Sequence, residues 1–269
     1  MKTVLVTGAS SGMGKAAARR LLADGHVVYA VARREESMRD LAELGAVVVA
    51  VDVTSEPDVV QLVKRITAER GGVDVLVNNA GFGLFGAVED VTLDEARYQF
   101  EVNLFALARL AQLVLPGMRE RRSGRIVNMS SMGGRIYTPL GAWYHATKHA
   151  LEGWSDCLRL ELAPFGIDVV IIEPGLIDTG FADVAAGPVL QRSGAGPYAT
   201  MAKRVVEGTR QQYANGATPP SVIADVIAEA IGARRPRTRY VAGKYARMLI
   251  LMRRWLGDRV YDRSVMSRL

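Results

Sequence analysis

The sequence is poor in the features that several protein classes depend on. Its only cysteine, Cys157, excludes an intramolecular disulfide, and we expect it to pack as a small hydrophobic side chain. No stretch without charged residues exceeds 14 residues, which is too short for a helix that spans a membrane. Residues 1–10 lack the long apolar region of a secretory signal. We therefore expect a cytoplasmic protein without a transmembrane segment.

The overall composition is that of a globular protein. Hydrophobic residues make up 49% and charged residues 23% of the 269 residues, which excludes wholesale disorder. The net charge of +6 favours solubility and anionic ligands, but it is too small to indicate nucleic acid as a partner. No linker divides residues 1–178, and we expect a single domain over residues 1–269.

Short runs rich in Val and Ile alternate with longer helical stretches. Such continuous apolar runs are typical of parallel strands that are covered on both faces. The alternation predicts an α/β fold, a doubly wound parallel sheet of about seven strands with helices on both faces. The expected strands are Thr3–Thr7, Val27–Val31, Val47–Val51, Val73–Val77, Arg125–Met129, Asp168–Ile172 and Arg239–Ala242.

Three helices have recognisable starting signals. One is a capping box, Thr92–Glu95, and a second is Ser55 followed by Pro57. The third is Ser221, which follows two prolines and would place Asp225 in the first turn.

Two segments near the C-terminus depart from the alternating pattern. Residues 179–216 are rich in Gly, Ala and Ser, and we expect Pro188 and Pro197 to break them, which favours a substrate lid over a domain linker. Residues 244–269 combine apolar side chains with many arginines. We expect a helical extension that packs on the body or on a neighbouring subunit; the alternative is peripheral contact with an acidic membrane surface.

A glycine-rich turn joins the first expected strand to a helix expected over Lys15–Ala23. Its sequence, Thr7-Gly-Ala-Ser-Ser-Gly-Met-Gly14, has a spacing different from the common G-x-G-x-x-G pattern. Glycines at such a position let the backbone turn tightly and let a pyrophosphate approach the amides of the helix N-terminus. The turn therefore predicts a nucleotide site.

Polar or glycine-containing segments also follow four later strands. In an open parallel sheet, ligands bind beyond the carboxyl ends of the strands, where these segments meet. We therefore expect a cofactor to lie along this edge. The segments are Asp52–Val53, Asn78–Gly81, Asn128–Ser131 and Glu173–Gly175.

Several of these motifs, taken in order, resemble the classical short-chain dehydrogenase/reductase family. They keep the family's order and spacing to about residue 180, with Met13 and Thr147 as small departures. The motifs are Thr7–Gly14, Asn78–Gly81, Asn103, Ser131, Tyr144-His-Ala-Thr-Lys148 and Pro174–Gly175.

The resemblance implies a single-domain Rossmann-type fold and an oxidoreductase that acts on CH–OH groups with a nicotinamide cofactor. It also implies a homodimer or homotetramer. The run Val28–Arg33 and the arginine-rich C-terminus are similar to members that act on steroid- or retinoid-like alcohols.

The resemblance also assigns roles to individual residues. The implied catalytic residues are Asn103, Ser131, Tyr144 and Lys148, with Asn103 holding a water between Lys148 and solvent. The implied cofactor residues are Gly8, Ser10, Ser11, Gly12, Met13, Gly14, Arg33, Asp52, Val53, Asn79, Ala80, Gly81, Tyr144, Lys148, Pro174, Gly175, Ile177 and Thr179. Beside Ser131 and Tyr144, the expected substrate residues are Phe82, Leu140, Trp143 and Phe181, with Leu84 and Phe85 nearby.

The spacing of Tyr144 and Lys148 suits acid–base chemistry. Reduction of a carbonyl places negative charge on its oxygen, which requires a proton donor. A phenol with a pKa near 10 is a poor base unless a positive charge stabilises the phenolate. Lys148 lies four residues after Tyr144, on the same face of a helix.

The residues after the second strand indicate which dinucleotide is used. A carboxylate there favours NAD, whereas an arginine favours the 2′-phosphate of NADP. The position 18 residues past Gly14 is Ala32, and Arg33 follows it. We therefore expect NADP(H) to be preferred over NAD(H), with Ser10 or Ser11 adding a hydroxyl donor.

Other functions remain as alternatives. One is a nucleotide-sensing protein of this fold that has lost catalysis, although Ser131, Tyr144 and Lys148 are all present. Another is an NAD-dependent dehydrogenase of a small alcohol. A third is an enzyme of this fold that catalyses epimerisation or dehydration. His145 and His149 are one helical turn apart, but no third metal ligand accompanies them, and we expect no metal. No G-x-S-x-G motif indicates a hydrolase.

Overall fold

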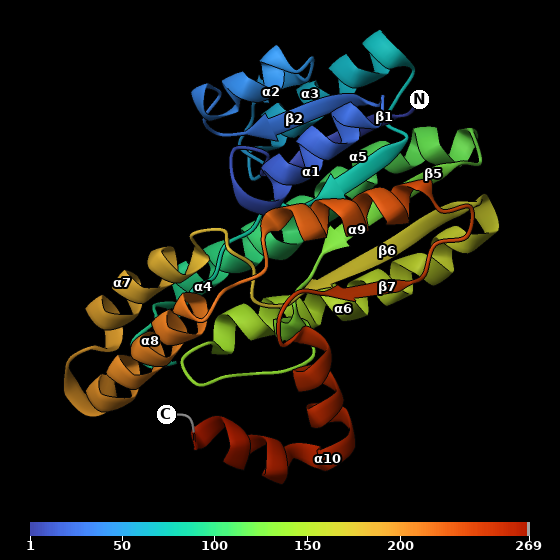
Figure 1. Ribbon diagram of the computed structural model, residues 1–269. Coiled ribbons are helices and arrows are strands. Elements are labelled where there is room, and N and C mark those ends of the chain that lie inside the picture. Colours follow the sequence, from blue (N-terminus) through green and yellow to red (C-terminus); the bar gives the residue numbers. More distant parts are fainter. Residues whose placement is uncertain (268–269) are drawn as a thin grey trace.

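The computed structural model describes residues 1–267, including all side chains except those of residues 181–186. The described residues form one seven-stranded parallel sheet in the order β3-β2-β1-β4-β5-β6-β7 (Figure 1). The sequence-based prediction of the fold is thus confirmed. The strands are β1 (Thr3–Thr7), β2 (Val27–Ala32), β3 (Val47–Ala50), β4 (Val75–Asn78), β5 (Gly124–Met129), β6 (Ile167–Pro174) and β7 (Arg239–Ala242).

Helices cover the sheet on both faces. The core layer on one face joins the strands to α1, α2 and α9, and the layer on the other face joins them to α3, α5 and α6. In Figure 1, α1 and α9 run in front of the sheet and contact each other. The helices are α1 (Gly12–Ala23), α2 (Arg39–Glu43), α3 (Glu56–Arg70), α4 (Leu93–Phe100), α5 (Ala106–Glu120), α6 (Ala142–Leu162), α7 (Phe181–Ser193), α8 (Ala199–Ala214), α9 (Pro220–Gly232) and α10 (Ala246–Met266).

The strand order reverses between β1 and β4. The chain moves from β1 outward to β2 and β3, and then returns to pair β4 with the other side of β1. At such a switch point the loops after the two central strands diverge to opposite faces and leave room for a ligand. These loops are the glycine-rich turn after β1 and the segment that begins at Asn79 after β4.

The predicted helix starts are partly correct. Thr92 and Glu95 form the expected capping box, in which each side chain binds the backbone N–H of the other residue. The glycine-rich turn is shorter than expected, because α1 begins at Gly12. The prediction for the helix near Ser221 was wrong by one residue, because Pro220 fits the first helical position. Asp225 therefore lies in the second turn, where it pairs with Arg20 of α1.

The segment over residues 179–216 is mostly helical. It contains α7, a short 3-10 turn (Gly196–Tyr198) and α8, which pack against each other as a projecting pair (Figure 1). The expectation that Pro188 breaks this segment was wrong, since Pro188 lies inside α7. Packing explains this: Val189 and Leu190, which follow the proline, join an apolar cluster with α8 that stabilises the helix despite its missing N–H.

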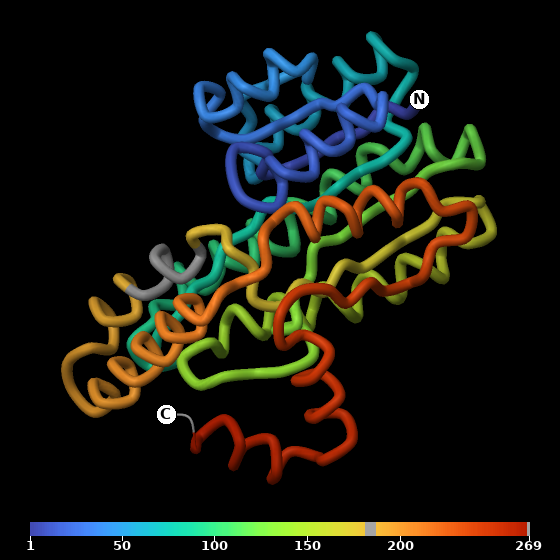
Figure 2. The backbone as a smooth tube through the Cα atoms, in the orientation of Figure 1, coloured from blue at the N-terminus to red at the C-terminus, as the bar shows by residue number. Residues whose placement is uncertain are grey.

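The C-terminal segment folds back under the body. Its helix α10 is interrupted at Gly257, where φ is +74°, so it consists of two helical segments. Figure 2 shows this bend, with the chain passing below the sheet toward the α7–α8 pair. No helix within residues 1–267 is long and apolar enough to cross a bilayer.

The expected burial of Cys157 was wrong, because its side chain is exposed. The buried positions of α6 include Leu151, Ser155 and Leu158, which share one helical face. Cys157 lies on another face of the same helix and contributes nothing to the core.

Candidate active site

The glycine-rich turn is a tight loop between β1 and α1. Gly8 and Gly12 have φ values of +66° and +54°, which residues with a side chain rarely adopt. A Cβ on Gly14 would lie 2.5 Å from the carbonyl oxygen of Gly8. The path of the backbone itself therefore requires glycine at these three positions.

Thr7 and Asn79 join this loop to the loop after β4. The Asn79 Nδ2 donates to the carbonyl oxygen of Thr7 at 2.9 Å, and the Thr7 Oγ1 accepts from the N–H groups of Asn79 and Ala80, both at 3.0 Å. The two loops at the switch point are thus fixed to each other. Sequence analysis gave Thr7 no such role; the available signal was a hydroxyl residue at the end of a strand, directly before glycine.

The first turn of α1 presents unpaired backbone donors to this edge. Intrahelical bonding begins with the N–H of Lys15, which donates to Ser11, so the N–H groups of the first three helical residues have no intrahelical acceptor. Ser11 is exposed and Ser10 half-buried, and neither is consumed in capping the helix. Such a helix N-terminus is suited to bind a phosphate.

The end of β2 carries the residues expected to select the cofactor. Ala32 is 8% exposed, and the exposed Arg33 follows it directly. Asp52 lies beyond the end of the neighbouring β3 and accepts two hydrogen bonds from Thr54, at 2.8 and 3.0 Å. These bonds, and to a smaller extent the charge of Arg33, lower the pKa of Asp52. Val53 is half-buried beside it.

Helix α6 and the end of β5 bring three of the predicted catalytic residues together. Tyr144 and Ser131 share a hydrogen bond between their hydroxyl groups. Lys148 is 7% exposed, and its Nζ donates to the carbonyl oxygen of Met129 at 2.8 Å. The Lys148 Nζ also lies close to Gly81, since a Cβ added to that glycine would be 3.8 Å from it. The reactive side chains therefore lie next to the loop at the switch point.

Asn103 is buried in a one-turn π-helix, Glu101–Phe105, between α4 and α5. Its side chain exchanges two hydrogen bonds of 3.0 Å with the backbone of Phe82, and its Nδ2 donates to the Thr147 hydroxyl at 3.1 Å. The Thr147 hydroxyl in turn donates to the carbonyl oxygen of Tyr144 at 2.8 Å. Asn103 thus fixes both the loop after β4 and the turn of α6 that carries the tyrosine. Local π-helices of this kind are frequent at functional sites.

Burial dominates the electrostatics of the reactive side chains. It raises the pKa of Tyr144, while the hydrogen bond from Ser131 opposes this rise. Burial also lowers the pKa of Lys148 to about 8, against the opposing charge of Glu152 one turn further along α6. The expected stabilisation of the phenolate by Lys148 is therefore not the dominant effect in the protein alone, because the ammonium binds a backbone carbonyl instead.

The apolar side chains expected at the site fall into two groups. The first group packs with Val91 and with Ala96 of α4; it consists of Phe82, Leu84 and Trp143. Phe85 lies on the Tyr144 ring, with 5.3 Å between centroids, and packs against the cluster that joins Leu140 to α7 and α8. Phe85 and Leu140 thus flank the tyrosine, whereas the first group mainly holds the loop. The side chain of Phe181 lies outside the described residues.

His145 has a positioning role that sequence analysis missed. Its Nδ1 lies 2.8 Å from the carbonyl oxygen of Gly133, and its Nε2 accepts from the N–H of Thr138 at 3.1 Å. Burial lowers its pKa to about 4, so the ring is neutral. Both nitrogens are used to hold the loop before Tyr144 and are not available to a metal. Among residues 1–267, no cluster of His, Cys, Asp and Glu has the arrangement of a metal site.

The remaining predicted cofactor residues follow β6. Gly175 passes so close to the backbone of Lys244 that a Cβ could not be accommodated. Ile177 packs with Met13 in the core layer under α1 and α9. Thr179 reaches the glycine-rich turn, since a Cβ on Gly12 would be 3.2 Å from its side chain. The segment after β6 therefore closes the edge opposite the loop after β4.

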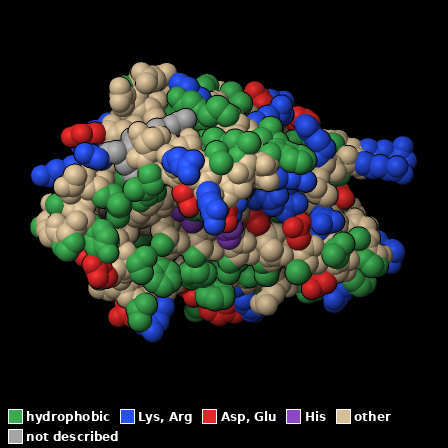
Figure 3. Space-filling model, turned by 90° about the horizontal axis from the view of Figure 1, so that it is seen from below, with side chains coloured by type: hydrophobic (Ala, Val, Ile, Leu, Met, Phe, Trp, Pro, Cys, Tyr) green, Lys and Arg blue, Asp and Glu red, His purple; other side chains and the backbone are tan. Residues whose placement is uncertain are grey.

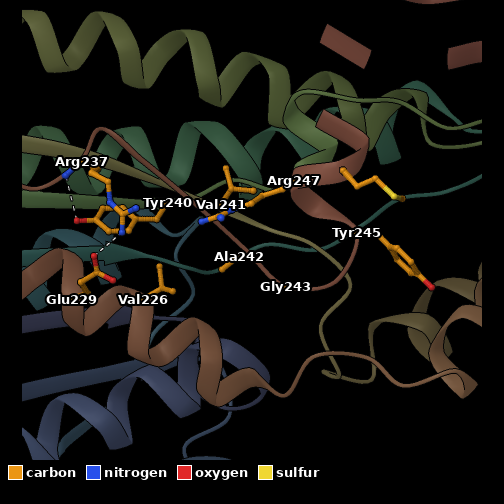
Figure 4. A pocket seen from close by; sticks show the side chains of 10 residues that line it. Val226, Glu229, Arg237, Tyr240, Val241, Ala242, Gly243, Tyr245 and Arg247 are labelled. Atoms are coloured by element: carbon orange, nitrogen blue, oxygen red, sulfur yellow. Dashed lines mark hydrogen bonds and ion pairs between the residues drawn. The ribbon is translucent and has the colours of Figure 1, made fainter. Parts of the chain in front are cut away.

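A surface pocket lies beside this segment, since the Gly175 N–H donates at 2.8 Å to the carbonyl oxygen of Ala242, which lines the pocket. It is bordered by α9, by the edge strand β7 and by the start of α10, and in Figure 4 Arg237 lies at one end of it, beside Tyr240 and Glu229. Arg237 pairs with Glu229 at 2.6 Å and lies over the Tyr240 ring. None of the predicted site residues lines this pocket.

The chain is similar to known proteins in its sequence and in its fold. A family model described as short chain dehydrogenase matches residues 2–186. The 3-ketodihydrosphingosine reductase of Bacteroides thetaiotaomicron is 36% identical over 258 residues, which cover 95% of this chain and 93% of that protein. An NADPH-dependent 3-dehydrocapnine reductase of Ornithobacterium rhinotracheale is 32% identical over 275 residues, covering 98% and 95%.

The fold has a similar counterpart among solved structures. A short-chain dehydrogenase from Streptomyces avermitilis superposes with a TM-score of 0.77 and 35% identity, over 93% of this chain and 91% of that one. The match of the family model extends from β1 to α7 and so includes every predicted catalytic residue. The chain belongs to the short-chain dehydrogenase/reductase family of oxidoreductases.

Proposed function

We propose that this protein is an NADP(H)-dependent oxidoreductase that interconverts a hydrophobic ketone and its alcohol, with Tyr144 as the general acid and base. The observation that supports this most directly is the hydrogen-bonded pair of Ser131 and Tyr144 hydroxyls beside the buried Lys148. A bound nicotinamide dinucleotide would supply or accept the hydride. The chain itself would provide the binding cradle and the proton.

In this proposal, Ser131 orients the substrate oxygen and Tyr144 exchanges a proton with it. Because burial raises the pKa of Tyr144, the phenol is protonated at neutral pH and suited to donate to a developing alkoxide. This protonation state suits the reduction of the ketone. Lys148 would bind the nicotinamide ribose. Asn103 would hold the π-helix against the turn of α6 that carries Tyr144, through its hydrogen bond to Thr147.

The cradle fits a dinucleotide on three observations. The free N–H groups of α1 suit the pyrophosphate, the small side chain of Ala32 leaves space at the end of β2, and Arg33 is exposed there without a carboxylate on β2 to oppose a phosphate. One relative carries NADPH dependence in its name. These features support NADP(H) over NAD(H).

The apolar surroundings of Tyr144 support a hydrophobic substrate. Phe85 and Leu140 flank the tyrosine and continue into the apolar cluster formed with α7 and α8. Two relatives are named as reductases of 3-ketodihydrosphingosine and of 3-dehydrocapnine. A first panel should therefore contain 3-ketodihydrosphingosine, a steroid ketone, a retinoid aldehyde and small polar ketones. Faster turnover of the small polar ketones would contradict this substrate class.

The catalytic assignment is tested by Tyr144→Phe. Loss of the proton donor should lower turnover at least about 100-fold while the dissociation constant for NADPH stays nearly unchanged. Tyr98→Phe, at an exposed position on α4, is the matched control. Turnover of Tyr144→Phe within threefold of the unmodified protein would refute the assignment. NADPH binding without turnover in the unmodified protein would favour a nucleotide-sensing role.

The cofactor assignment is tested by equilibrium binding of NADPH and NADH. A charge-assisted hydrogen bond from Arg33 contributes about 1.5–3 kcal/mol, so NADPH should bind at least about tenfold more tightly. Replacing Ala32 by Asp together with Arg33→Leu should reverse the preference by like-charge repulsion. Equal dissociation constants in the unmodified protein would refute this preference, and tighter binding of NADH would support an NAD-dependent dehydrogenase.

A further inference from the structure

Helix α10 carries a face that the rest of the chain does not cover. In its first segment Met248, Leu251 and Trp255 are 50%, 51% and 73% exposed. Their spacing of three and four residues places them on one side of the helix. Arg247 and Arg254, both exposed, flank this apolar stripe, and the Arg254 guanidinium lies 5.5 Å from the centre of the Trp255 ring. We call these five residues the α10 stripe.

The start of α10 and its second segment attach the helix to the body. Ala246 and Tyr261 are buried, the Tyr261 hydroxyl donates to the carbonyl oxygen of Tyr137 at 2.9 Å, and the Tyr137 hydroxyl donates to Asp262 at 2.8 Å. The tyrosine rings also meet edge to face, 5.1 Å apart. The helix is therefore docked on the loop before α6 while its apolar stripe stays exposed.

The charge on α10 is strongly one-sided. The helix contains five arginines and two aspartates, and both aspartates are already engaged, Asp258 by Arg253 and Asp262 by Tyr137. Within the described part of the chain, the other four arginines form no ion pair; they are Arg247, Arg254, Arg259 and Arg263. Figure 3 views the molecule from this side and shows apolar side chains interspersed with Lys and Arg and also with Asp and Glu.

We propose that the α10 stripe docks this protein on an anionic lipid bilayer. Exposed Trp and Leu next to unpaired arginines are the pattern of a helix that lies in the membrane interface, with its apolar side chains below the headgroups. The arginines meet the negative surface potential of the lipids. A second copy of this chain is a poorer partner, because an isologous contact would bring the same positive face against itself.

The position of α10 would bring a docked bilayer close to the proposed active site. Its second segment holds Tyr137, and the same loop continues through Leu140, beside α7 and α8, to Tyr144. A bilayer bound at the stripe would therefore lie next to the elements around the proposed site, from which a hydrophobic substrate could enter. Membrane binding itself is independent of the proposed activity and is measured without substrate.

The test is sedimentation of the full chain with vesicles of phosphatidylcholine alone and of phosphatidylcholine with 30% phosphatidylglycerol. We expect binding to the anionic vesicles only, weakened by 0.5 M salt, with a blue shift of tryptophan emission that Trp255→Phe removes. Absence of binding to the anionic vesicles overturns the proposal.

Two pairs of substitutions locate the binding surface. Arg247→Gln with Arg254→Gln should lower the partition coefficient about 25-fold, from about fivefold for each arginine near the surface. Leu251→Ala with Trp255→Ala should lower it at least about tenfold. The matched control is Arg234→Gln with Arg235→Gln, which removes the same charge from exposed positions at the other end of β7.

The outcomes separate the possible occupants of the stripe. Equal loss of vesicle binding in the control and in the α10 variants shows a nonspecific charge effect and overturns the proposal. A change of oligomeric state in the Leu251 and Trp255 variant, measured by light scattering, shows contact between copies and also overturns it. Since the readout is binding, failure here leaves the test of Tyr144 unaffected.

Discussion

Replacing Glu173 by glutamine should stabilise the protein increasingly as the pH rises from 5.5 to 8. Glu173, on β6, is 2% exposed and lies beside Glu152 of α6, which is 5% exposed. Two arginines face this pair: Arg239 lies 3.0 Å from Glu152 and 3.3 Å from Glu173, and Arg135 lies 3.7 Å and 3.9 Å away. Despite them, burial and the charge of Glu152 raise the pKa of Glu173 from 4.5 to about 7.

The sign of the effect follows from proton binding. A carboxyl group with a raised pKa in the folded state binds more protons there than in the unfolded chain between pH 4.5 and 7, so stability falls as pH rises through this window. The full change between pH 5.5 and 8 would be about 2 kcal/mol. The side chains of Arg135 and Arg239, which face the pair, are 37% and 23% exposed, so solvent screening reduces this to about 1–2 kcal/mol.

His145 has the opposite influence. Its pKa is lowered from 6.5 to about 4, so it favours the folded state more as pH rises from 4 to 6.5. The two groups partly cancel in the unmodified protein, and its own pH profile is therefore a poor measure of either one. The informative quantity is the difference in free energy of unfolding between variant and unmodified protein, in which the contribution of His145 drops out.

The assay is urea unfolding of both proteins at pH 5.5, 6.5, 7.5 and 8. The stabilisation by Glu173→Gln should be about 1–2 kcal/mol larger at pH 8 than at pH 5.5. Glu161→Gln, at an exposed position near the end of α6, is the matched control and should give a difference that does not change with pH. If the difference in free energy of unfolding between Glu173→Gln and the unmodified protein is the same at every pH, or if the variant is less stable at pH 8, the pKa of Glu173 is not raised in the folded protein.

Two further substitutions test contacts of the site. Gly14→Ala would place a Cβ 2.5 Å from a backbone oxygen of the glycine-rich turn, so titration should show at least about tenfold weaker NADPH binding; unchanged affinity would show that the turn is not the phosphate cradle. Arg192→Leu removes the two bonds, of 2.7 and 3.0 Å, that tie α7 to Glu95, and cleavage of α7 by a protease should accelerate several-fold relative to Arg204→Leu, at an exposed position of α8. Equal cleavage rates would show that this ion pair does not hold the helix.

Local patterns in the sequence were sufficient for the architecture of this protein. Continuous Val and Ile runs predicted all seven strands to within a few residues, because strands buried on both faces admit little else. The glycines of the first turn predicted a tight loop, and the spacing of Tyr144 and Lys148 predicted one face of a helix, for a similar reason. A tight backbone path and a helical repeat each constrain residues that are close in the chain.

The tertiary structure decided what these elements bring together. The contact of Asn103 with Thr147 joins residues 44 apart, and the pairing of Glu152 with Glu173 depends on α6 lying against β6. Neither contact leaves a local signal, because the strand order and the helix faces set it. The same reason explains the errors at Pro188 and Cys157: packing against α8 decided the first, and the buried face of α6 decided the second. Periodicity and turn chemistry are local properties of the sequence, whereas burial and charge pairing depend on neighbours that only the folded chain supplies.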